Sequence, residues 1–188
     1  MANVVKLTAS DGSTVEFYDE IKAQGGVKDV YFSTDKTYVV AFYRKPTNAN
    51  DKARLENIVG VYREKIFIQN SDGGYWHDIF AWPTKMVEWK GLTGIVIPFY
   101  NKKFFFTGVD SQWPFIKNGQ EKNGKWFSSA KLINKFVPAD QKGTFLSRLH
   151  MCLKIARGIR RIHAAGLAHS DLSYNNVLVD PLSGSACI

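Results

Sequence analysis

Short apolar runs separated by turn residues dominate the first hundred positions of the chain. The runs are rich in β-branched and aromatic residues, which is typical of strands, and the polar clusters between them are typical of turns. The run 38–43 is apolar throughout, which predicts a strand that is covered on both faces. The expected strands, paired as hairpins, are 4–9 with 14–18, 27–33 with 37–43, and 85–89 with 94–98.

One segment with a helical period interrupts these strands. Its apolar residues recur at the spacing of a single helix face, which predicts a helix over about 51–69. This stripe consists of Leu55, Ile58, Val59, Tyr62 and Ile66. Strands on both sides of one helix favour an antiparallel sheet with a helix packed on it. The expected fold class is therefore α+β, with a first domain over residues 1–98.

The second domain, over residues 99–188, has a different pattern. Residues 101–126 are basic and irregular, and they are followed by a short helix at 128–136 and a long one at 144–165. The side of the long helix expected to be buried contains Leu149, Cys152, Leu153, Ala156, Ile159 and His163, widened by Ile155 and Ile162. The side expected to face solvent contains Lys154, Arg157 and Arg161. Short strands at 177–179 and 186–188 complete the pattern.

Composition excludes several classes of protein. Hydrophobic residues are 45% and aromatic residues 14% of the 188 residues, which is too apolar for a disordered tail. Cys152 and Cys187 lie far apart, so neither a disulfide framework nor a zinc site is expected, and reduced thiols favour a cytoplasmic protein. The first residues lack the pattern of a signal peptide, and no apolar run could span a membrane. No membrane partner is therefore expected.

The formal net charge of +8 favours anionic partners such as nucleotides or acidic protein surfaces. No zinc finger, RNA-binding aromatic motif or basic zipper accompanies this charge, so nucleic-acid binding is not expected. Positive charge in excess also occurs without any such partner, so charge alone assigns no function.

The densest chemical signal is the segment His169-Ser-Asp-Leu-Ser-Tyr-Asn-Asn176, between the long helix and a short strand. Phosphoryl transfer needs a carboxylate that orients or accepts the substrate hydroxyl, and oxygen ligands that hold Mg²⁺ on the phosphates. Asp171 fits the first role, and Asn176 fits the second as a metal ligand. His163 and His169 are expected to pack or to brace the loop rather than to transfer protons.

This segment resembles the catalytic loop of protein kinases, H-R-D-L-x-x-x-N, and the helix before it ends as the helix of that family does. The resemblance implies a protein-kinase-like fold and makes Asp171 and Asn176 catalytic residues. Ser170 replaces the usual Arg that reads a phosphorylated activation loop, which implies activity not gated in that manner. Ser173 replaces the usual Lys, and the resulting loop is similar to that of the atypical RIO-type kinases. The loop also resembles H-G-D-x-x-x-x-N of small-molecule phosphotransferases such as the aminoglycoside kinases.

The same resemblance implies a nucleotide site in the first domain. The glycine-rich loop of the family would lie at Gly25 and Gly26, although only Gly25 matches one of its three glycine positions. The segment 98–100 resembles the hinge whose backbone meets the adenine edge, through Phe99 and Tyr100. The residues implied to sandwich the base are Val30, Ala41 and Leu178.

The lysine that holds the nucleotide phosphates has two candidates. Val40-Ala41-Phe42-Tyr43 resembles the family's V-A-I-K, with Tyr43 in the place of the lysine. Lys45 lies two residues later on the same face of the strand. Lys28 stands at the third glycine position, as in the with-no-lysine kinases, and we favour it over Lys45. Its acidic partner on the helix would be Glu56 or Glu64, which the pattern does not separate.

The D-F-G aspartate of kinases, which binds magnesium, follows the loop Asn by about thirteen or fourteen residues. That position would be residue 189 or 190, whereas the sequence ends at Ile188. The resemblance thus covers the chain but about two-thirds of a kinase domain, with 99–188 as the hinge and an incomplete C-lobe. Asn176 alone should hold Mg²⁺ poorly, so we expect the chain by itself to be nearly inactive.

The leading hypothesis is ATP- and Mg²⁺-dependent phosphoryl transfer to Ser/Thr hydroxyls of a protein substrate. Gly25-Gly26-x-Lys28 and Ala81-Trp82-Pro83 look similar to bacterial eukaryotic-like kinases of tellurium-resistance gene clusters, and this placement suggests a cognate phosphatase as a further partner. One alternative is a phosphotransferase acting on aminoglycosides or sugars. The other is a non-catalytic pseudokinase or scaffold, for which the missing strand lysine and the missing D-F-G aspartate argue.

Overall fold

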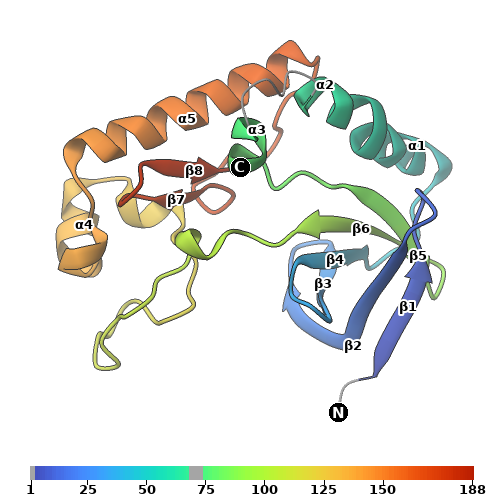
Figure 1. The fold of residues 1–188 in the computed structure, drawn as a ribbon, viewed down its shortest axis with the longest axis horizontal. Helices are drawn as coiled ribbons and strands as arrows, with labels where there is room; N and C mark the ends of the chain where they lie inside the picture. The colour runs from blue at the N-terminus through green and yellow to red at the C-terminus, as the bar shows by residue number, and fades with distance from the viewer. Residues whose placement is uncertain (1–2, 68–73) are drawn as a thin grey trace. The chain divides into compact units, whose positions relative to one another are not determined.

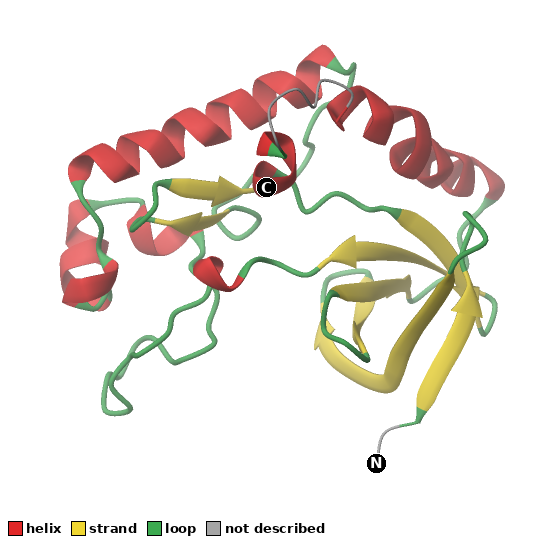
Figure 2. Cartoon of the chain, viewed as in Figure 1, coloured by secondary structure: helices red, strands yellow, loops and turns green. Residues whose placement is uncertain are grey.

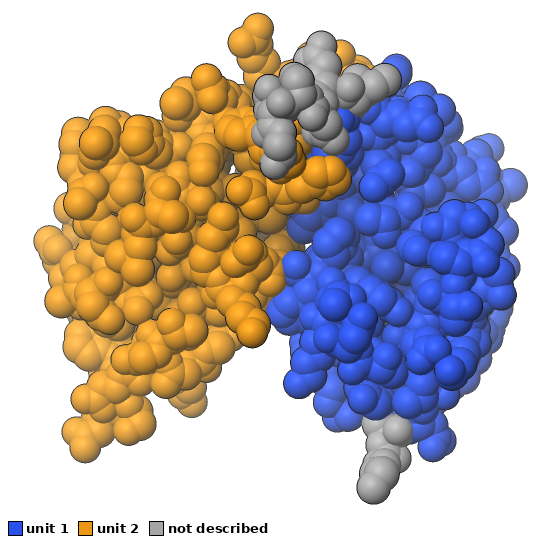
Figure 3. Space-filling view, in the orientation of Figure 1, with its two compact units in different colours: residues 1–68, 81–99 blue, residues 69–80, 100–188 orange. Residues whose placement is uncertain are grey.

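The computed structural model describes residues 3–67 and 74–188. They form two compact units, 1–68 with 81–99 and 69–80 with 100–188, which Figure 3 shows in different colours. The change of unit at 99/100 lies one residue from the boundary expected from the sequence. Helix α3 (Tyr75–Ile79) groups with the second unit because the backbone N–H of Ile188 donates to the carbonyl of Ile79 at 2.7 Å.

A six-stranded antiparallel sheet in the order β1-β2-β3-β4-β6-β5 makes up most of the first unit (Figure 2). Its strands are β1 (Val4–Thr8), β2 (Thr14–Gln24), β3 (Lys28–Ser33), β4 (Tyr38–Tyr43), β5 (Lys85–Trp89) and β6 (Leu92–Pro98). The three predicted hairpins are confirmed. Strand β2 runs beyond the predicted end at residue 18, and its pairing with β3 shifts register twice after Phe17. These irregularities break the alternation of apolar residues by which a strand is recognised.

Both faces of β4 are covered, as its continuous apolar run predicted. Val40 and Phe42 belong to a cluster with Phe17 and Tyr31 on one face of the sheet. Ala41 belongs to a second cluster on the opposite face. The other buried members of this second cluster are Leu55, Met86 and Ile95, with Val30, Tyr43, Val59 and Ile97 packed against them.

The helix of the first unit has three parts. These are α1 (Ala49–Asn57), a five-residue π-helical segment (Ile58–Tyr62) and α2 (Arg63–Phe67). The side chain of Asn48 caps α1 by accepting from the N–H of Asp51 at 2.9 Å, so the helix begins two residues before the predicted start. Leu55 and Ile66 of the predicted stripe are buried. The predicted end at residue 69 lies outside the described residues.

The second unit is mainly helical, and its long helix α5 lies along a short hairpin (Figure 1). Among its described residues, the helices besides α3 are α4 (Ala130–Phe136), α5 (Phe145–Ala164) and the single 3-10 turns η3 (Lys102–Phe104), η4 (Gly124–Phe127) and η5 (Ala139–Gln141). The hairpin strands are β7 (Leu178–Asp180) and β8 (Ser185–Cys187). Of the helices that the structure describes, none combines the length and the apolar run that crossing a bilayer requires.

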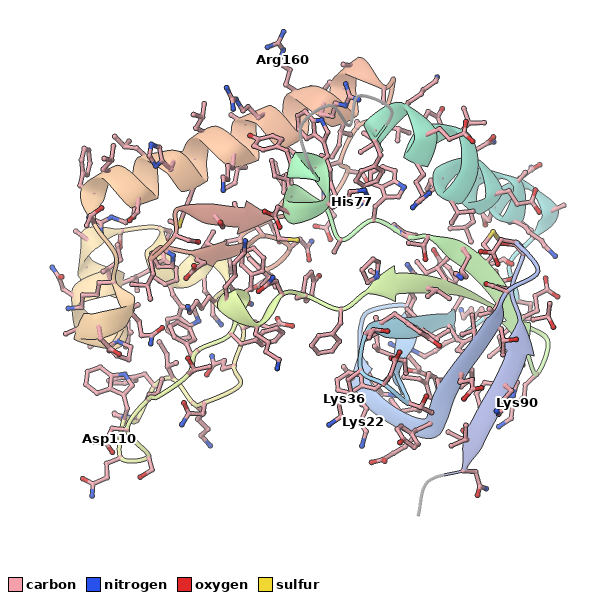
Figure 4. The ribbon with its side chains drawn as sticks, in the orientation of Figure 1. Lys22, Lys36, His77, Lys90, Asp110 and Arg160 are labelled. Carbon is pink, nitrogen blue, oxygen red and sulfur yellow. The ribbon has the colours of Figure 1, made fainter. Side chains whose placement is uncertain are left out.

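The buried side of α5 matches the predicted one only in part, through Ile162. Met151, Gly158 and Ile162 are buried, whereas Leu149 and Leu153 are about half exposed, at 48% and 50%. The predicted solvent side also turns inward in part, because Lys154 donates to the hydroxyl of Ser185 at 3.2 Å. Among the basic residues of this helix, Arg160 does point away from the hairpin, as Figure 4 shows.

Candidate functional site

The segment 165–177 joins helix α5 to strand β7 and carries the residues that resemble a catalytic loop. Helix α5 begins with a capping box between Thr144 and Ser147, and it ends at Ala164 before Gly166. Gly166 has a φ of +88°, the left-handed conformation that glycine adopts at least cost after a helix. The chain leaves the helix there, and 169–176 becomes a loop rather than a further turn of helix.

Asp171 and Asn176 are in direct contact within this loop. Asn176 Nδ2 donates to Asp171 Oδ2 at 2.9 Å and to the carbonyl oxygen of Asp171 at 2.7 Å. The backbone closes the same turn, since the N–H of Ser173 donates to the carbonyl of Asp171 at 3.1 Å. Both side chains are exposed. The amide nitrogen of Asn176 is thus committed to Asp171, which leaves its Oδ1 as the atom available to a cation.

A neighbouring segment, 122–124, braces the end of this loop. The N–H of Gly124 donates to the carbonyl oxygen of Val177 at 2.9 Å. The N–H of Val179 donates to the carbonyl oxygen of Lys122, also at 2.9 Å. A Cβ at position 124 would lie 3.3 Å from the carbonyl oxygen of Tyr174, within the loop itself. The close approach therefore favours glycine at this position, and it ties 171–176 to a second stretch of backbone.

A buried ion pair lies beneath the same strand. Lys122 Nζ is 3.0 Å from Asp180 Oδ1 and donates to the carbonyl of Lys103 at 2.9 Å. Burial raises the pKa of the Asp180 carboxyl, but hydrogen bonds from Ser183 and Lys122 and the Lys122 charge outweigh it, and the net pKa is lowered. The pair fixes β7 directly after Asn176. The sequence did not single it out, because an isolated lysine 58 positions from an aspartate carries no signal of pairing.

The two histidines occupy different environments. His169 is partly buried, and its Nδ1 is buried without a hydrogen-bond partner among the described residues. His163 is exposed on α5, so the prediction that it packs is wrong. Helical spacing placed His163 with apolar residues, but much of that side of the helix is exposed, including Leu149 and Leu153.

In the first unit, the turn between β2 and β3 contains Gly25 and Gly26. The N–H of Gly25 donates to the carbonyl of Lys28 at 2.9 Å, and the Arg44 guanidinium donates to the carbonyl of Gly25. A Cβ at Gly26 would meet nothing within 4 Å, and one at Gly25 would meet only Lys28 O, at 3.7 Å. Local packing therefore does not require these glycines. They leave open space over the turn, which is what a close approach of phosphate to backbone needs.

Strands β3 and β4 place the predicted nucleotide residues opposite one another. Val30 pairs with Ala41 and Lys28 pairs with Tyr43 in the antiparallel register. Opposite residues share a face of the sheet, so these four side chains lie on one face. Lys28 Nζ is 4.5 Å from the centroid of the Tyr43 ring. The ammonium group thus lies next to the position from which a strand lysine would project.

Lys45 lines a cavity of roughly 720 Å³ beside the glycine turn, and Lys28 does not. The cavity is bounded by Gly26 and Tyr43 on one side and by α1 on the other. Sequence reasoning missed two α1 residues that face it, Asp51 and Arg54, which are joined by an ion pair at 3.3 Å. The available signal was that Asp51 lies four residues before the buried Leu55 and Arg54 lies three residues after Asp51, because residues three and four apart are neighbours on a helix surface.

Neither of the two candidate glutamates reaches a candidate lysine. Glu56 lines a different cavity with Lys52 and Glu88, at the other side of α1. Glu64 is exposed on α2. No hydrogen bond or ion pair joins either glutamate to Lys28 or Lys45 in the described ranges, 3–67 and 74–188.

The hinge residues fall on the two sides of the unit boundary. The N–H of Phe99 donates to the carbonyl of Thr37 at 2.9 Å, and its ring meets Phe32 edge-on with centroids 5.3 Å apart. Tyr100 begins the second unit, where burial and, more weakly, the charges of Cys187 and Glu121 raise its pKa to about 12. Leu178, the remaining candidate for the base site, is buried in β7.

Solved structures of protein kinases resemble this chain over nearly its whole length. The Toxoplasma gondii specific rhoptry antigen kinase domain aligns with a TM-score of 0.56 at 13% identity, covering 97% of this chain and 52% of that one. The ROP18 kinase domain, in complex with AMP-PNP and sucrose, aligns with a TM-score of 0.54 at 15% identity, covering 99% and 54%. The chain has a protein-kinase fold. The expected α+β class and kinase-like architecture are thereby confirmed.

A third structure with this fold is ROP2 from Toxoplasma gondii, described as a virulence factor with a protein-kinase fold and no enzymatic activity. It aligns with a TM-score of 0.51 at 13% identity, covering 98% of this chain and 52% of that one. The chain spans about half the length of these kinase structures. The sequence matches no protein-family model and no curated protein. On the kinase fold, Asp171 and Asn176 belong to the helical unit, and Lys28 and Tyr43 to the sheet unit.

Proposed function

We propose that this chain carries the nucleotide-binding and catalytic-loop parts of a protein kinase, which transfers the γ-phosphoryl group of ATP to Ser/Thr hydroxyls. The observation that carries the proposal is the contact between Asp171 and Asn176 in the loop between α5 and β7. A carboxylate held by a neighbouring amide is oriented before substrate arrives, and positioning supplies much of the catalysis in phosphoryl transfer.

In this reaction Asp171 accepts a hydrogen bond from the substrate hydroxyl and orients it toward the phosphorus. Asp171 Oδ2 is occupied by Asn176, so Oδ1 is the atom that meets the hydroxyl. Within residues 3–67 and 74–188, no cluster of three His, Cys, Asp or Glu side chains is placed to hold a metal ion. The amide oxygen of Asn176 suits Mg²⁺, which would neutralise phosphate charge, but as a single ligand it would hold the ion weakly.

Nucleotide binding by the first unit is supported by its own geometry. Val30 and Ala41 form a cross-strand pair that presents small apolar side chains to the base, and Gly26 leaves room for phosphate. Lys28 supplies a positive charge on the same face. A structure with the same fold, the ROP18 kinase domain, was solved with AMP-PNP. A cytoplasmic location and a cognate phosphatase as partner also belong to this proposal.

A second candidate function is non-catalytic binding by a pseudokinase. Tyr43 stands where the V-A-I-K pattern has its lysine, and neither Glu56 nor Glu64 forms an ion pair with Lys28 or Lys45 in the described residues. ROP2 is described as having the same fold without enzymatic activity. This candidate predicts binding of ATP or of a partner with no transfer of phosphate.

The deciding experiment offers the full-length protein [γ-³²P]ATP and Mg²⁺ with a library of Ser/Thr peptides, sugars and aminoglycosides. Transfer of ³²P to Ser or Thr of a peptide, with loss of this transfer in the Asp171→Asn variant, supports the protein-kinase function. Label on a sugar or aminoglycoside would support the small-molecule phosphotransferase instead. ATP binding by calorimetry without label on any acceptor would favour the pseudokinase.

A further inference from the structure

Lys28 and Tyr43 lie directly opposite each other in the β3–β4 ladder. The Lys28 ammonium lies over the aromatic ring, 4.5 Å from its centroid, which is within the range of a cation–π interaction. No carboxylate pairs with Lys28 in the part of the chain that the structure describes, and its neighbour Asp29 is 3.3 Å from Arg44 Nε instead. The ring is therefore the contact that holds this cation.

The ring of Tyr43 is itself held in place. It packs against the cluster that contains Ala41 and Leu55, so both the strand and helix α1 support it. Tyr43 also lines the cavity of roughly 720 Å³, which Gly26 of the glycine turn lines as well. Lys28 does not itself line this cavity, but its ammonium lies over a ring that does, on the face that also carries Val30.

We propose that Tyr43 is a positioning residue: its ring holds the Lys28 ammonium in place for the phosphates of a nucleotide. This inference rests on the proposed nucleotide binding, but not on phosphoryl transfer. An aromatic ring attracts the cation without neutralising its charge and without accepting its N–H groups in strong hydrogen bonds. A carboxylate partner would do both. The ring thus restricts a flexible lysine and leaves its three donors for phosphate oxygens.

The contact can be tested without any nucleotide. Protons held over an aromatic ring resonate upfield, so the Lys28 ε-methylene signal in the ¹H–¹³C spectrum of the full-length protein should be shifted upfield. Tyr43→Leu should abolish this shift, and Tyr43→Phe should preserve it. Lys90, which lies 3.9 Å from the centroid of the Trp89 ring, is the matched control, and its signal should be the same in all variants. A Lys28 signal at the random-coil position in the unmodified protein would overturn the inference.

The role toward phosphate is tested by titrating the same variants with MgATP and with adenosine. Tyr43→Leu should weaken MgATP binding by about 2- to 30-fold, the range that cation–π energies correspond to, and leave adenosine binding unchanged. Tyr43→Phe should bind as the unmodified protein does. Lys28→Met should lose MgATP affinity as well, and Lys28→Met/Tyr43→Lys, which moves the lysine to the opposite strand, should regain part of it.

The possible results distinguish a failure of this inference from a failure of the proposed function. Equal MgATP affinity in Tyr43→Leu and the unmodified protein overturns the positioning role, and so does equal weakening of ATP and adenosine, which would indicate a damaged fold. Absence of MgATP binding in the unmodified protein overturns both. Normal MgATP binding that depends on Tyr43, without any phosphate transfer, supports the inference and counts against the kinase.

Discussion

Asn176 Nδ2 donates two hydrogen bonds to one residue, Asp171, reaching its carboxylate at 2.9 Å and its carbonyl oxygen at 2.7 Å. This double contact fixes both the side chain and the backbone of Asp171 relative to Asn176. Charged acceptors strengthen such bonds, so the pair orients the carboxylate although both side chains are exposed to solvent. The orientation of a carboxylate is usually fixed by burial, and here hydrogen bonds within the loop fix it instead.

Replacing Asp171 with Ala should lower kcat of the full-length protein by a factor on the order of 10²–10⁴, the usual contribution of a general base. MgATP affinity should stay unchanged, because Asp171 acts on the acceptor hydroxyl and not on the nucleotide. Steady-state kinetics with a peptide substrate and calorimetric titration with MgATP measure the two quantities. Asp110→Ala removes an exposed aspartate elsewhere in the same unit and should behave as the unmodified protein. Full activity in Asp171→Ala would refute the kinase assignment.

Lys28→Met and Lys45→Met should affect turnover unequally. Lys28 is held over Tyr43, whereas Lys45 is exposed and has no partner among the described residues. A free lysine side chain must lose conformational entropy of up to roughly 2 kcal/mol to bind phosphate, so the restrained lysine contributes more. We expect Lys28→Met to raise KM for ATP and lower kcat, with a mild effect of Lys45→Met. The reverse order would show that the lysine at the end of β4 holds the phosphates.

The strands of the sheet and the place of the candidate loop between α5 and β7 could be predicted from the sequence, because both depend on local patterns. Short runs of β-branched and aromatic residues between turns identify strands such as β4, and a short motif with fixed spacing singles out Asp171 and Asn176 as candidates. Residues that act across long separations could not be found in this way. The partner of Lys28 is an aromatic residue on the next strand, and only the β3–β4 register brings the two together.

The orientation of α5 shows a second limit. Gly158 faces inward because a Cβ there would lie 3.0 Å from Ile79 and 2.8 Å from Ile188, so a close approach selects the buried side. Arg161 also turns inward, over the ring of Trp76 at 5.2 Å. The hydrophobic pattern did not place Gly158 and put Arg161 on the wrong side, because it records neither close backbone packing nor the cation–π contacts of long side chains.

The exposed apolar side of α5 should promote self-association of the 188-residue chain. Leu149 and Leu153 are 48% and 50% exposed, beside the still more exposed Phe145 and Leu146. The double substitution Leu149→Lys/Leu153→Lys should lower the associated fraction in sedimentation velocity and change the free energy of unfolding by less than about 0.5 kcal/mol per site. Met151→Lys on the buried side is the contrasting variant and should unfold the chain, because it buries an unpaired charge. A large loss of stability in the double variant would mean that this side is packed.

The buried pair Lys122–Asp180 should make stability depend on pH in the acid range. The pKa of Asp180 is lowered in the folded chain, so the unfolded state takes up its proton first. The stability that the carboxylate contributes is therefore fully present above its unfolded pKa, near 3.9, and is lost as pH falls through the lower folded pKa. Asp180→Asn should lack this contribution, so the difference in unfolding free energy between the two proteins should shrink as the pH falls below about 4.

Chemical denaturation of both proteins between pH 7 and pH 2 measures this difference, and other groups that titrate in the range cancel. Asp11 is one such group, since hydrogen bonds from Ser13 lower its pKa to about 2 in both proteins. At neutral pH, Lys122→Met should cost about 3–5 kcal/mol, because it leaves a buried carboxylate without its partner. The double variant Lys122→Met/Asp180→Leu should recover most of that loss, since it removes both charges from the interior. A pH-independent difference for Asp180→Asn, with no recovery in the double variant, would show that the pair stabilises β7 through packing rather than through its charge.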